Sequence, residues 1–150
     1  MQKITIIVGL PGSGKTTYIE NNKNNFKNAV ICDDYHKSSY NHSHNFEDSV
    51  YYEDLKRTLK SGEDAVLSDI AWCKTERREI LEKNIKNILE DIKINAEIIF
   101  IYFENNPEAC KKNVLKRNRN GRMEREMQFI DEVSAQYTIP DNAIIIPIIF

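Results

Sequence analysis

Eight residues near the start of the chain have the order of a loop that binds phosphate. Residues 9–16 read GLPGSGKT, a full match to the pattern GxxxxGK[ST], and they follow the apolar run 4–8. A buried strand that ends in a glycine-rich turn leaves backbone N–H groups facing an anion, and the helix after it adds the positive end of its dipole. The pattern therefore predicts a nucleoside triphosphate site, formed by Gly9, Leu10, Pro11, Gly12, Ser13, Gly14, Lys15, Thr16 and Thr17.

Two side chains of this loop have chemistry suited to a triphosphate. Lys15 stands at the start of the expected helix, so its ammonium can reach the β- and γ-phosphates as a mobile charge. The Thr16 hydroxyl can complete the coordination shell of a Mg²⁺ ion that bridges those phosphates. We therefore expect Lys15 to be catalytic and Thr16 to be a metal ligand.

Carboxylates follow two further apolar runs. Asp33 and Asp34 come after residues 29–32, and Asp69 comes after residues 65–68. If these runs are parallel strands, all three acids emerge at the edge of the sheet that carries the phosphate loop. Asp33 can take the proton of a hydroxyl that attacks the γ-phosphate, whereas Asp34 is equally well explained as a turn residue. Asp69 can hold a water of the Mg²⁺ shell or contact the acceptor. Capping of the next helix explains Asp69 less well, because Thr75 is the more natural cap of that helix.

Composition limits what can accompany this loop. With 150 residues, of which 41% are hydrophobic and 29% charged, the chain fits one domain, 1–150, of an ordinary globular protein. It has no apolar stretch long enough for a membrane span and no leader pattern, so we expect a cytoplasmic protein. The three widely spaced cysteines are expected to be free core thiols.

Charge is distributed unevenly along the chain. Residues 111–125 hold seven basic residues and one acidic residue, a net charge of +6, although the whole chain carries −2. The remainder therefore carries −8. This distribution argues against a surface coated throughout for nucleic acid and favours one local anion-binding surface beside the phosphate loop.

The spacing of apolar residues predicts alternating strands and helices. Runs at 4–8, 29–32, 65–68, 97–103 and 143–150 are typical of buried parallel strands, and Pro147 places the last one at a sheet edge. Apolar residues at helical spacing lie between them, at Tyr51, Leu55 and Leu59; at Leu81, Ile85, Ile88 and Ile92; at Cys110 and Val114; and at Met123, Met127, Ile130 and Val133. This order predicts an α/β fold, with a five-stranded parallel sheet covered by helices on both faces.

Several segments resemble the polynucleotide-kinase-like branch of the P-loop kinases, in particular the kinase domain of bacteriophage polynucleotide 5′-hydroxyl kinase. The similar segments are GLPGSGKTT at 9–17, ICDDY at 31–35, VLSD at 66–69, TERR at 75–78 and NVLKRN at 113–118. The resemblance implies a P-loop NTPase fold with a small helical lid at about 116–126. It also implies ATP, Mg²⁺ and transfer of the γ-phosphoryl group to a hydroxyl, with Asp33 as general base and Asp69 facing the acceptor.

The chain departs from that family pattern where an acceptor would be read. His36 stands where the family has an arginine, and Ile70 replaces an expected threonine. The lid arginine is displaced, so Arg119 or Arg122 must serve; we favour Arg122 as the catalytic group and Arg119 as an ATP contact. Arg117 either binds ATP or pairs with a helix carboxylate.

Three functions from different classes fit these residues. The first is a kinase of a polynucleotide or nucleotide 5′-hydroxyl. The second is a kinase of a small metabolite, nucleotide sugar or antibiotic, which the His36 substitution and the acidic remainder of the chain favour. The third is a nucleotide-binding ATPase module that acts through a partner protein. The acceptor distinguishes the first two, and phosphoryl transfer distinguishes both from the third.

Overall fold

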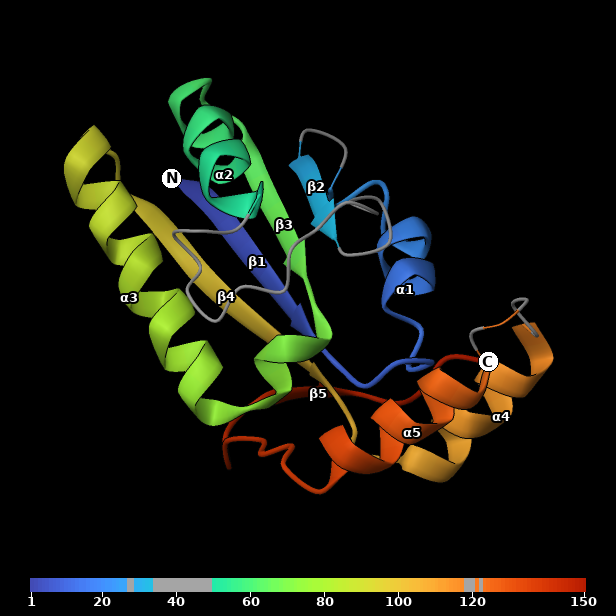
Figure 1. Cartoon of the computed structure of the whole chain (residues 1–150). Helices are drawn as coiled ribbons and strands as arrows, with labels where there is room; N and C mark the ends of the chain where they lie inside the picture. Colours follow the sequence, from blue (N-terminus) through green and yellow to red (C-terminus); the bar gives the residue numbers. More distant parts are fainter. Residues whose placement is uncertain (27–28, 34–49, 118–120, 122) are drawn as a thin grey trace.

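The sheet of this protein is built from five parallel strands. A computed structural model of the chain describes residues 1–26, 29–33, 50–117, 121 and 123–150, with the backbone alone at 29–33 and 50–51. The sheet order is β2-β3-β1-β4-β5 (Figure 1), and each neighbouring pair is parallel. The strands are β1 (Gln2–Val8), β2 (Ala29–Asp33), β3 (Asp64–Ser68), β4 (Ala96–Phe103) and β5 (Ile144–Ile146).

Helices connect the strands and cover the sheet. They are α1 (Lys15–Asn21), α2 (Val50–Lys60), the 3₁₀ turn η2 (Ile70–Cys73), α3 (Thr75–Ile92), α4 (Pro107–Arg117) and α5 (Met123–Ser134). In Figure 1, α2 and α3 lie on one side of the sheet and α1 on the other, while α4 and α5 pack against each other beside the loop that precedes α1. The predicted α/β fold with a parallel sheet is confirmed.

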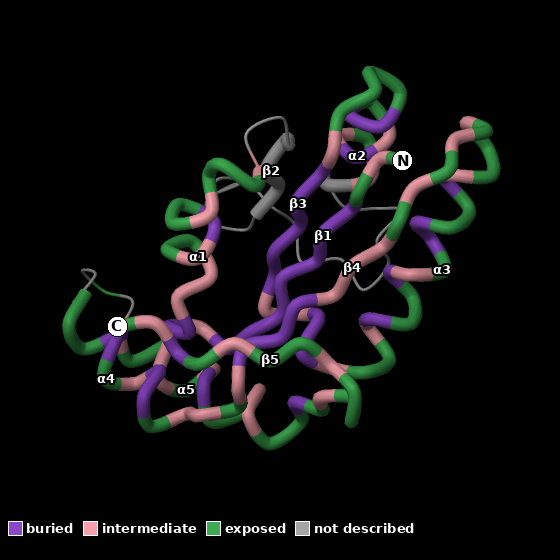
Figure 2. Tube along the Cα trace, turned by 180° about the vertical axis from the view of Figure 1, so that it is seen from behind, coloured by how far each residue is buried: buried purple, intermediate pink, exposed green. Residues whose placement is uncertain are grey.

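The central strand β1 explains why the sheet is covered on both faces. Ile4, Ile6, Ile7 and Val8 are all fully buried, although successive side chains of a strand point to opposite faces. A continuous apolar run is typical of a parallel strand with helices on both sides. Figure 2 shows the buried residues concentrated along β1 and β3. This core fixes the end of β1, where the phosphate loop begins.

Helix α3 follows the predicted apolar stripe. Leu81, Ile85 and Ile88 are fully buried at helical spacing. The prediction that Thr75 caps this helix is wrong. Thr75 is the first residue of the helix, and the cap residue is Lys74, whose side chain makes no capping hydrogen bond. The helix ends at Lys93, which adopts the left-handed conformation with φ 58°.

Two elements differ from the sequence-based expectation. Strand β5 lies at the sheet edge as predicted but ends before Pro147, because proline has no N–H for the ladder. The chain then turns toward the phosphate loop. The η2 turn was not predicted.

None of the described helices is long and apolar enough to cross a membrane. Cys73 and Cys110 are buried free thiols.

Candidate active site

The loop between β1 and α1 has a backbone that only glycine supports at two positions. Gly12 has φ 80° and Gly14 has φ 101°, both in the left-handed region. A Cβ at Gly12 would lie 2.5 Å from the Cys110 carbonyl oxygen, and a Cβ at Gly14 would lie 2.8 Å from Ile149 Cβ. Glycine is therefore required by conformation and by close packing, as in a phosphate loop.

The donors of this loop face away from the protein's own acceptors. Among the described residues, none accepts a hydrogen bond from the backbone N–H of Gly14, Lys15, Thr16 or Thr17. These groups open helix α1, so their dipoles add at one point. Lys15 Nζ donates to the carbonyls of Gly9 at 2.9 Å and of Leu10 at 3.0 Å, which keeps its charge inside the loop. Free amides and an ammonium together fit the phosphates of a nucleotide.

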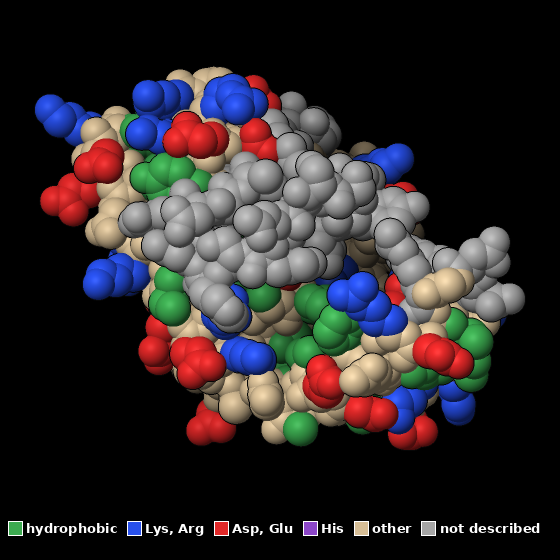
Figure 3. Space-filling view, in the orientation of Figure 1, with side chains coloured by type: hydrophobic (Ala, Val, Ile, Leu, Met, Phe, Trp, Pro, Cys, Tyr) green, Lys and Arg blue, Asp and Glu red, His purple; other side chains and the backbone are tan. Residues whose placement is uncertain are grey.

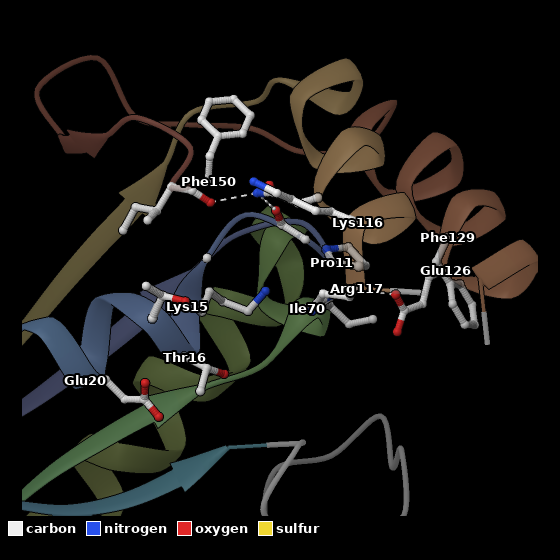
Figure 4. Close-up of a pocket in the computed structure, with 15 residues that line it drawn as sticks. Pro11, Lys15, Thr16, Glu20, Ile70, Lys116, Arg117, Glu126, Phe129 and Phe150 are labelled. Carbon is white, nitrogen blue, oxygen red and sulfur yellow. Dashed lines mark hydrogen bonds and ion pairs between the residues drawn. The ribbon is translucent and has the colours of Figure 1, made fainter. Parts of the chain in front are cut away.

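A cavity of about 540 Å³ opens beside the loop. Figure 4 shows Lys15 and Thr16 on α1, Lys116 and Arg117 on α4, and Glu126 and Phe129 on α5. The volume of this cavity suits a small organic ligand. Thr16 is exposed in the first turn of α1 and lines this cavity, so its predicted role as a metal ligand is sterically open.

Arg117 lies at the end of α4 and forms an ion pair with a residue of α5. Its Nη2 atom is 2.9 Å from Glu126 Oε2 on α5. The predicted pairing with a helix carboxylate is confirmed. Because Arg117 also lines the cavity, a contact with ATP stays a prediction. Arg119 and Arg122 lie outside the described residues, as does most of the segment between α4 and α5.

The end of β3 places Asp69 next to the phosphate loop strand. Asp69 is fully buried, and its Oδ1 accepts a hydrogen bond of 2.8 Å from the backbone N–H of Ala71. The carboxylate therefore caps η2, an element that we had not predicted, and not the helix that begins at Thr75. Ile70, the next residue, lines the cavity. Asp69 as a ligand of the Mg²⁺ shell remains a prediction.

Asp33 ends β2 at the same edge of the sheet. In the strand register Asp33 pairs with Ser68, and Ser68 pairs with Ile7 of β1. Since neighbouring strands are about 4.8 Å apart, the Asp33 backbone lies roughly 10 Å across the sheet from β1. The expected convergence of strand ends is thus observed in the backbone. Asp34, His36 and residues 37–45 lie outside the described part of the chain.

A buried arginine that sequence reasoning missed holds the loop after β3. Arg78 is 7% exposed, and its guanidinium donates to the carbonyls of Trp72 and Cys73, each at 2.8 Å, and of Thr138 at 2.7 Å. The same group lies 5.2 Å from the centre of the Tyr102 ring, a cation–π distance. Arg78 thereby ties η2 to the segment after α5.

Two thiols lie near the charge of Lys15. Burial raises the pKa of Cys73 to about 12 and that of Cys110 to about 11, although the positive charge of Lys15 opposes the rise at both. Both thiols therefore stay protonated at neutral pH. They fill space beneath the site and are poor nucleophiles.

Comparison with known proteins supports the fold and the kinship of the chain. No model of a known protein family matches the sequence. Among solved structures, a fungal RNA kinase is similar with a TM-score of 0.64 and 15% identity, over 97% of this chain and 73% of that one. A gluconokinase from Sinorhizobium meliloti 1021 has a TM-score of 0.60 and 13% identity, over 98% of this chain and 82% of that one.

A third solved structure is the APS kinase of Mycobacterium tuberculosis in complex with AMPPNP and APS. Its TM-score is 0.55 and its identity 16%, over 97% of this chain and 88% of that one. The chain therefore has the fold of P-loop kinases, and the predicted resemblance is confirmed at that level. An uncharacterized protein of Acanthamoeba polyphaga mimivirus is 30% identical over 138 residues, which are 92% of this chain and 88% of that protein. The chain belongs to the same family as this mimivirus protein.

Proposed function

We propose that this chain is an ATP- and Mg²⁺-dependent phosphotransferase that moves the γ-phosphoryl group to a 5′-hydroxyl of a polynucleotide or nucleotide. One observation carries the proposal: the free amides of Gly14, Lys15, Thr16 and Thr17 open beside the ends of β3 and β2, where carboxylate residues stand. A nucleotide held by those amides would have its terminal phosphate near the two strand ends. The fold of P-loop kinases supports the same chemistry.

Each predicted residue then has a role in the transfer. Lys15 binds the β- and γ-phosphates and balances charge on the oxygens that the γ-phosphoryl leaves. Asp33 orients the acceptor hydroxyl and accepts its proton. Arg122, with Arg119 and Arg117 contacting ATP, supplies positive charge from the lid. Thr16 and Asp69 are the residues that would hold Mg²⁺, which lowers the charge repulsion between phosphates when bound.

The nucleic acid acceptor is supported by three observations. The fungal RNA kinase shares the fold over 97% of this chain. Two segments resemble a polynucleotide kinase, and their described residues, 31–33 and 66–69, lie at the ends of the paired strands β2 and β3. Lys116 also lines the cavity and adds positive charge beside the ion pair of Arg117 with Glu126.

A transfer assay tests this proposal. Protein, Mg²⁺ and γ-labelled ATP are mixed with an oligonucleotide that has a 5′-hydroxyl, and with the same oligonucleotide that already carries a 5′-phosphate. We expect label on the first and none on the second. Intact ATP with no labelled oligonucleotide would contradict the polynucleotide assignment.

A second candidate is a kinase with a small acceptor. It is supported by the likeness to gluconokinase and APS kinase and by the net charge of −2. On the face in Figure 3, acidic and basic side chains of the described residues are interspersed. A salt titration separates the candidates: polynucleotide phosphorylation should weaken steeply with salt, whereas transfer to a neutral small molecule should change little.

Replacement of Asp33 distinguishes both kinases from an ATPase module. In a kinase, Asp33→Ala should reduce transfer by about 10²-fold or more and leave ATP binding intact. In a module that only hydrolyses ATP, turnover should be nearly unchanged. Binding of ATP measured by calorimetry in parallel shows that the variant is folded and loaded.

A further inference from the structure

A buried amide on α4 joins two carbonyl oxygens that are far apart in the sequence. Asn113 is 9% exposed, and its Nδ2 donates to the Gly12 carbonyl at 2.8 Å and to the Ile149 carbonyl at 2.7 Å. The backbone N–H of Ile149 in turn donates to the Ser13 carbonyl at 3.1 Å. Two consecutive carbonyls of the phosphate loop are thus held by donors from outside the loop.

These contacts fix the direction in which loop amides point. In a trans peptide the C=O and N–H lie in one plane and point opposite ways. The Ser13 carbonyl shares its plane with the N–H of Gly14, so the contact with Ile149 turns that N–H to the other side. The Gly12 carbonyl shares its plane with the N–H of Ser13, which donates to the Leu10 carbonyl at 3.1 Å. The Gly12–Ser13 plane is therefore held at both ends, whereas the Ser13–Gly14 plane is held at its carbonyl end alone, which leaves the Gly14 N–H for a ligand.

The need for such fixing follows from the glycines. A glycine populates left-handed and right-handed conformations about equally, so Gly12 and Gly14 make a loop that loses much entropy when it is ordered. A loop that is already ordered by outside contacts does not lose that entropy on binding, and its ligand binds more tightly. The packing of Ile149 against Gly14, where a Cβ would come within 2.8 Å, adds a steric limit to the same segment.

We propose that Asn113 is a positioning residue that, with the backbone of Ile149, pre-organises the phosphate loop for a triphosphate. The inference rests on the proposed function, because the triphosphate is its ligand. Asn113 lies four residues before Arg117 on α4, and residues at that spacing share a helix face. The same amide therefore fixes the loop relative to Lys116 and Arg117, the basic residues of α4 that line the cavity.

The test compares binding by wild type, Asn113→Ala and Asn113→Asp. Calorimetry measures the dissociation constants of Mg²⁺–ATP and of Mg²⁺–tripolyphosphate, which has no base or sugar. We expect Asn113→Ala to weaken the binding of both ligands by about tenfold or more, since the buried Gly12 carbonyl and the partly buried Ile149 carbonyl both lose a donor. Asn113→Asp keeps the shape but puts carboxylate oxygens against carbonyl oxygens, so its loss should be larger. In the transfer assay, KM for ATP should rise while kcat changes less than about threefold.

Asn84 supplies the matched control. It is a buried asparagine on α3, 6% exposed, so Asn84→Ala also removes a buried amide but should leave both dissociation constants unchanged. Wild type that binds neither ligand would contradict the proposed function and the positioning role together. Wild type that binds while both Asn113 variants bind equally well would overturn the positioning role alone. A loss confined to ATP, with tripolyphosphate unaffected, would also overturn it.

Discussion

The loops after β1 and β3 begin at the same edge of the sheet, but different kinds of side chain hold them in place. The neutral amide of Asn113 holds the loop after β1 through the Gly12 carbonyl. The charged guanidinium of Arg78 holds the loop after β3 through the Trp72 and Cys73 carbonyls. Each side chain also donates to a carbonyl late in the chain: Asn113 donates to that of Ile149, and Arg78 to that of Thr138. We call each of these sets of hydrogen bonds a tie.

The difference between the two ties follows the charge that each loop carries. The loop after β1 already contains the ammonium of Lys15. Because the amide of Asn113 is neutral, the positive potential at this loop comes from Lys15 and from the dipole of α1. The loop after β3 begins with the buried carboxylate of Asp69. Arg78 and Asp69 both act on the pKa of Cys73, which the cation lowers and the carboxylate raises. The loop that contains an ammonium is thus held by a neutral amide, and the loop that begins with a carboxylate is held by a cation.

The largest effect that would break this comparison is expected at Arg78. Arg78→Ala leaves three carbonyls without the guanidinium and should lower the free energy of unfolding by about 3 kcal/mol or more. Arg78→Lys should recover little, because a single ammonium cannot reach carbonyls on both segments as the planar guanidinium does. Urea denaturation followed by circular dichroism measures both variants.

An exposed arginine provides the reference for Arg78. The side chain of Arg57 is 75% exposed and its Nη2 lies 3.3 Å from Asp54 Oδ1. Arg57→Ala should change stability by less than about 0.5 kcal/mol, as expected for a surface ion pair. If Arg78→Ala were as mild as Arg57→Ala, the guanidinium would not be what holds the loop after β3.

The buried thiols beneath the two loops predict a dependence of stability on pH. Burial raises the pKa of Cys73 from 9.0 to about 12, and that of Cys110 to about 11. The unfolded chain loses these protons above pH 9 while the folded protein keeps them. Stability should therefore be constant below pH 9 and fall above it, by up to about 1.4 kcal/mol per pH unit for each thiol, and the fall should extend to higher pH for Cys73 because its pKa in the folded protein is higher.

Urea denaturation between pH 8 and pH 10.5 checks this slope. Cys73→Ser and Cys110→Ser should each flatten the curve by a similar amount, since both thiols stay largely protonated in the folded protein over this pH range. A variant that keeps the wild-type slope would contradict the raised pKa of the thiol that it lacks. A stability that rises above pH 9 would contradict the sign of both shifts.

A tyrosine hydroxyl gives a smaller test of the loop after β1. Tyr137 is buried, and its hydroxyl lies 2.5 Å from the Phe103 carbonyl and 3.4 Å from the carbonyl of Val8, the last residue of β1. Tyr137→Phe removes only the donor and should cost about 1 kcal/mol of stability. Nucleotide affinity should stay within about twofold, because Val8 lies before the loop; a larger loss in calorimetry would extend the positioning contacts beyond Asn113.

The parts of the fold that the sequence predicts are those whose cause is local. GLPGSGKT specifies the conformation of the phosphate loop by residue type, and Leu81, Ile85 and Ile88 specify the buried face of α3 by spacing. The η2 turn gives no such signal, since Ile, Ala, Trp and Cys in that order are compatible with a helix or a strand. Only the Asp69 side chain, capping Ala71, initiates the turn.

The ties of the site could not be predicted because their partners are distant. Asn113 and Gly12 are 101 residues apart, and Arg78 and Thr138 are 60 residues apart. A lone asparagine or arginine on a predicted helix is usually a surface residue. Asn113 did offer one clue, since it lies one turn before Arg117, a residue that we had already assigned to the site. Spacing alone could not show that its amide faces two carbonyls.

The smallest expected effect lies away from both loops, at the end of α3. Lys93 adopts φ 58°, a left-handed conformation that is unfavourable for a residue with a Cβ. Lys93→Gly should raise the free energy of unfolding by about 0.5 to 1 kcal/mol, which thermal and urea denaturation can resolve. Nucleotide affinity should not change. If Lys93→Gly tightened ATP binding, global stability would control the phosphate loop, and the loss caused by Asn113→Ala could no longer be attributed to the direction of the loop amides.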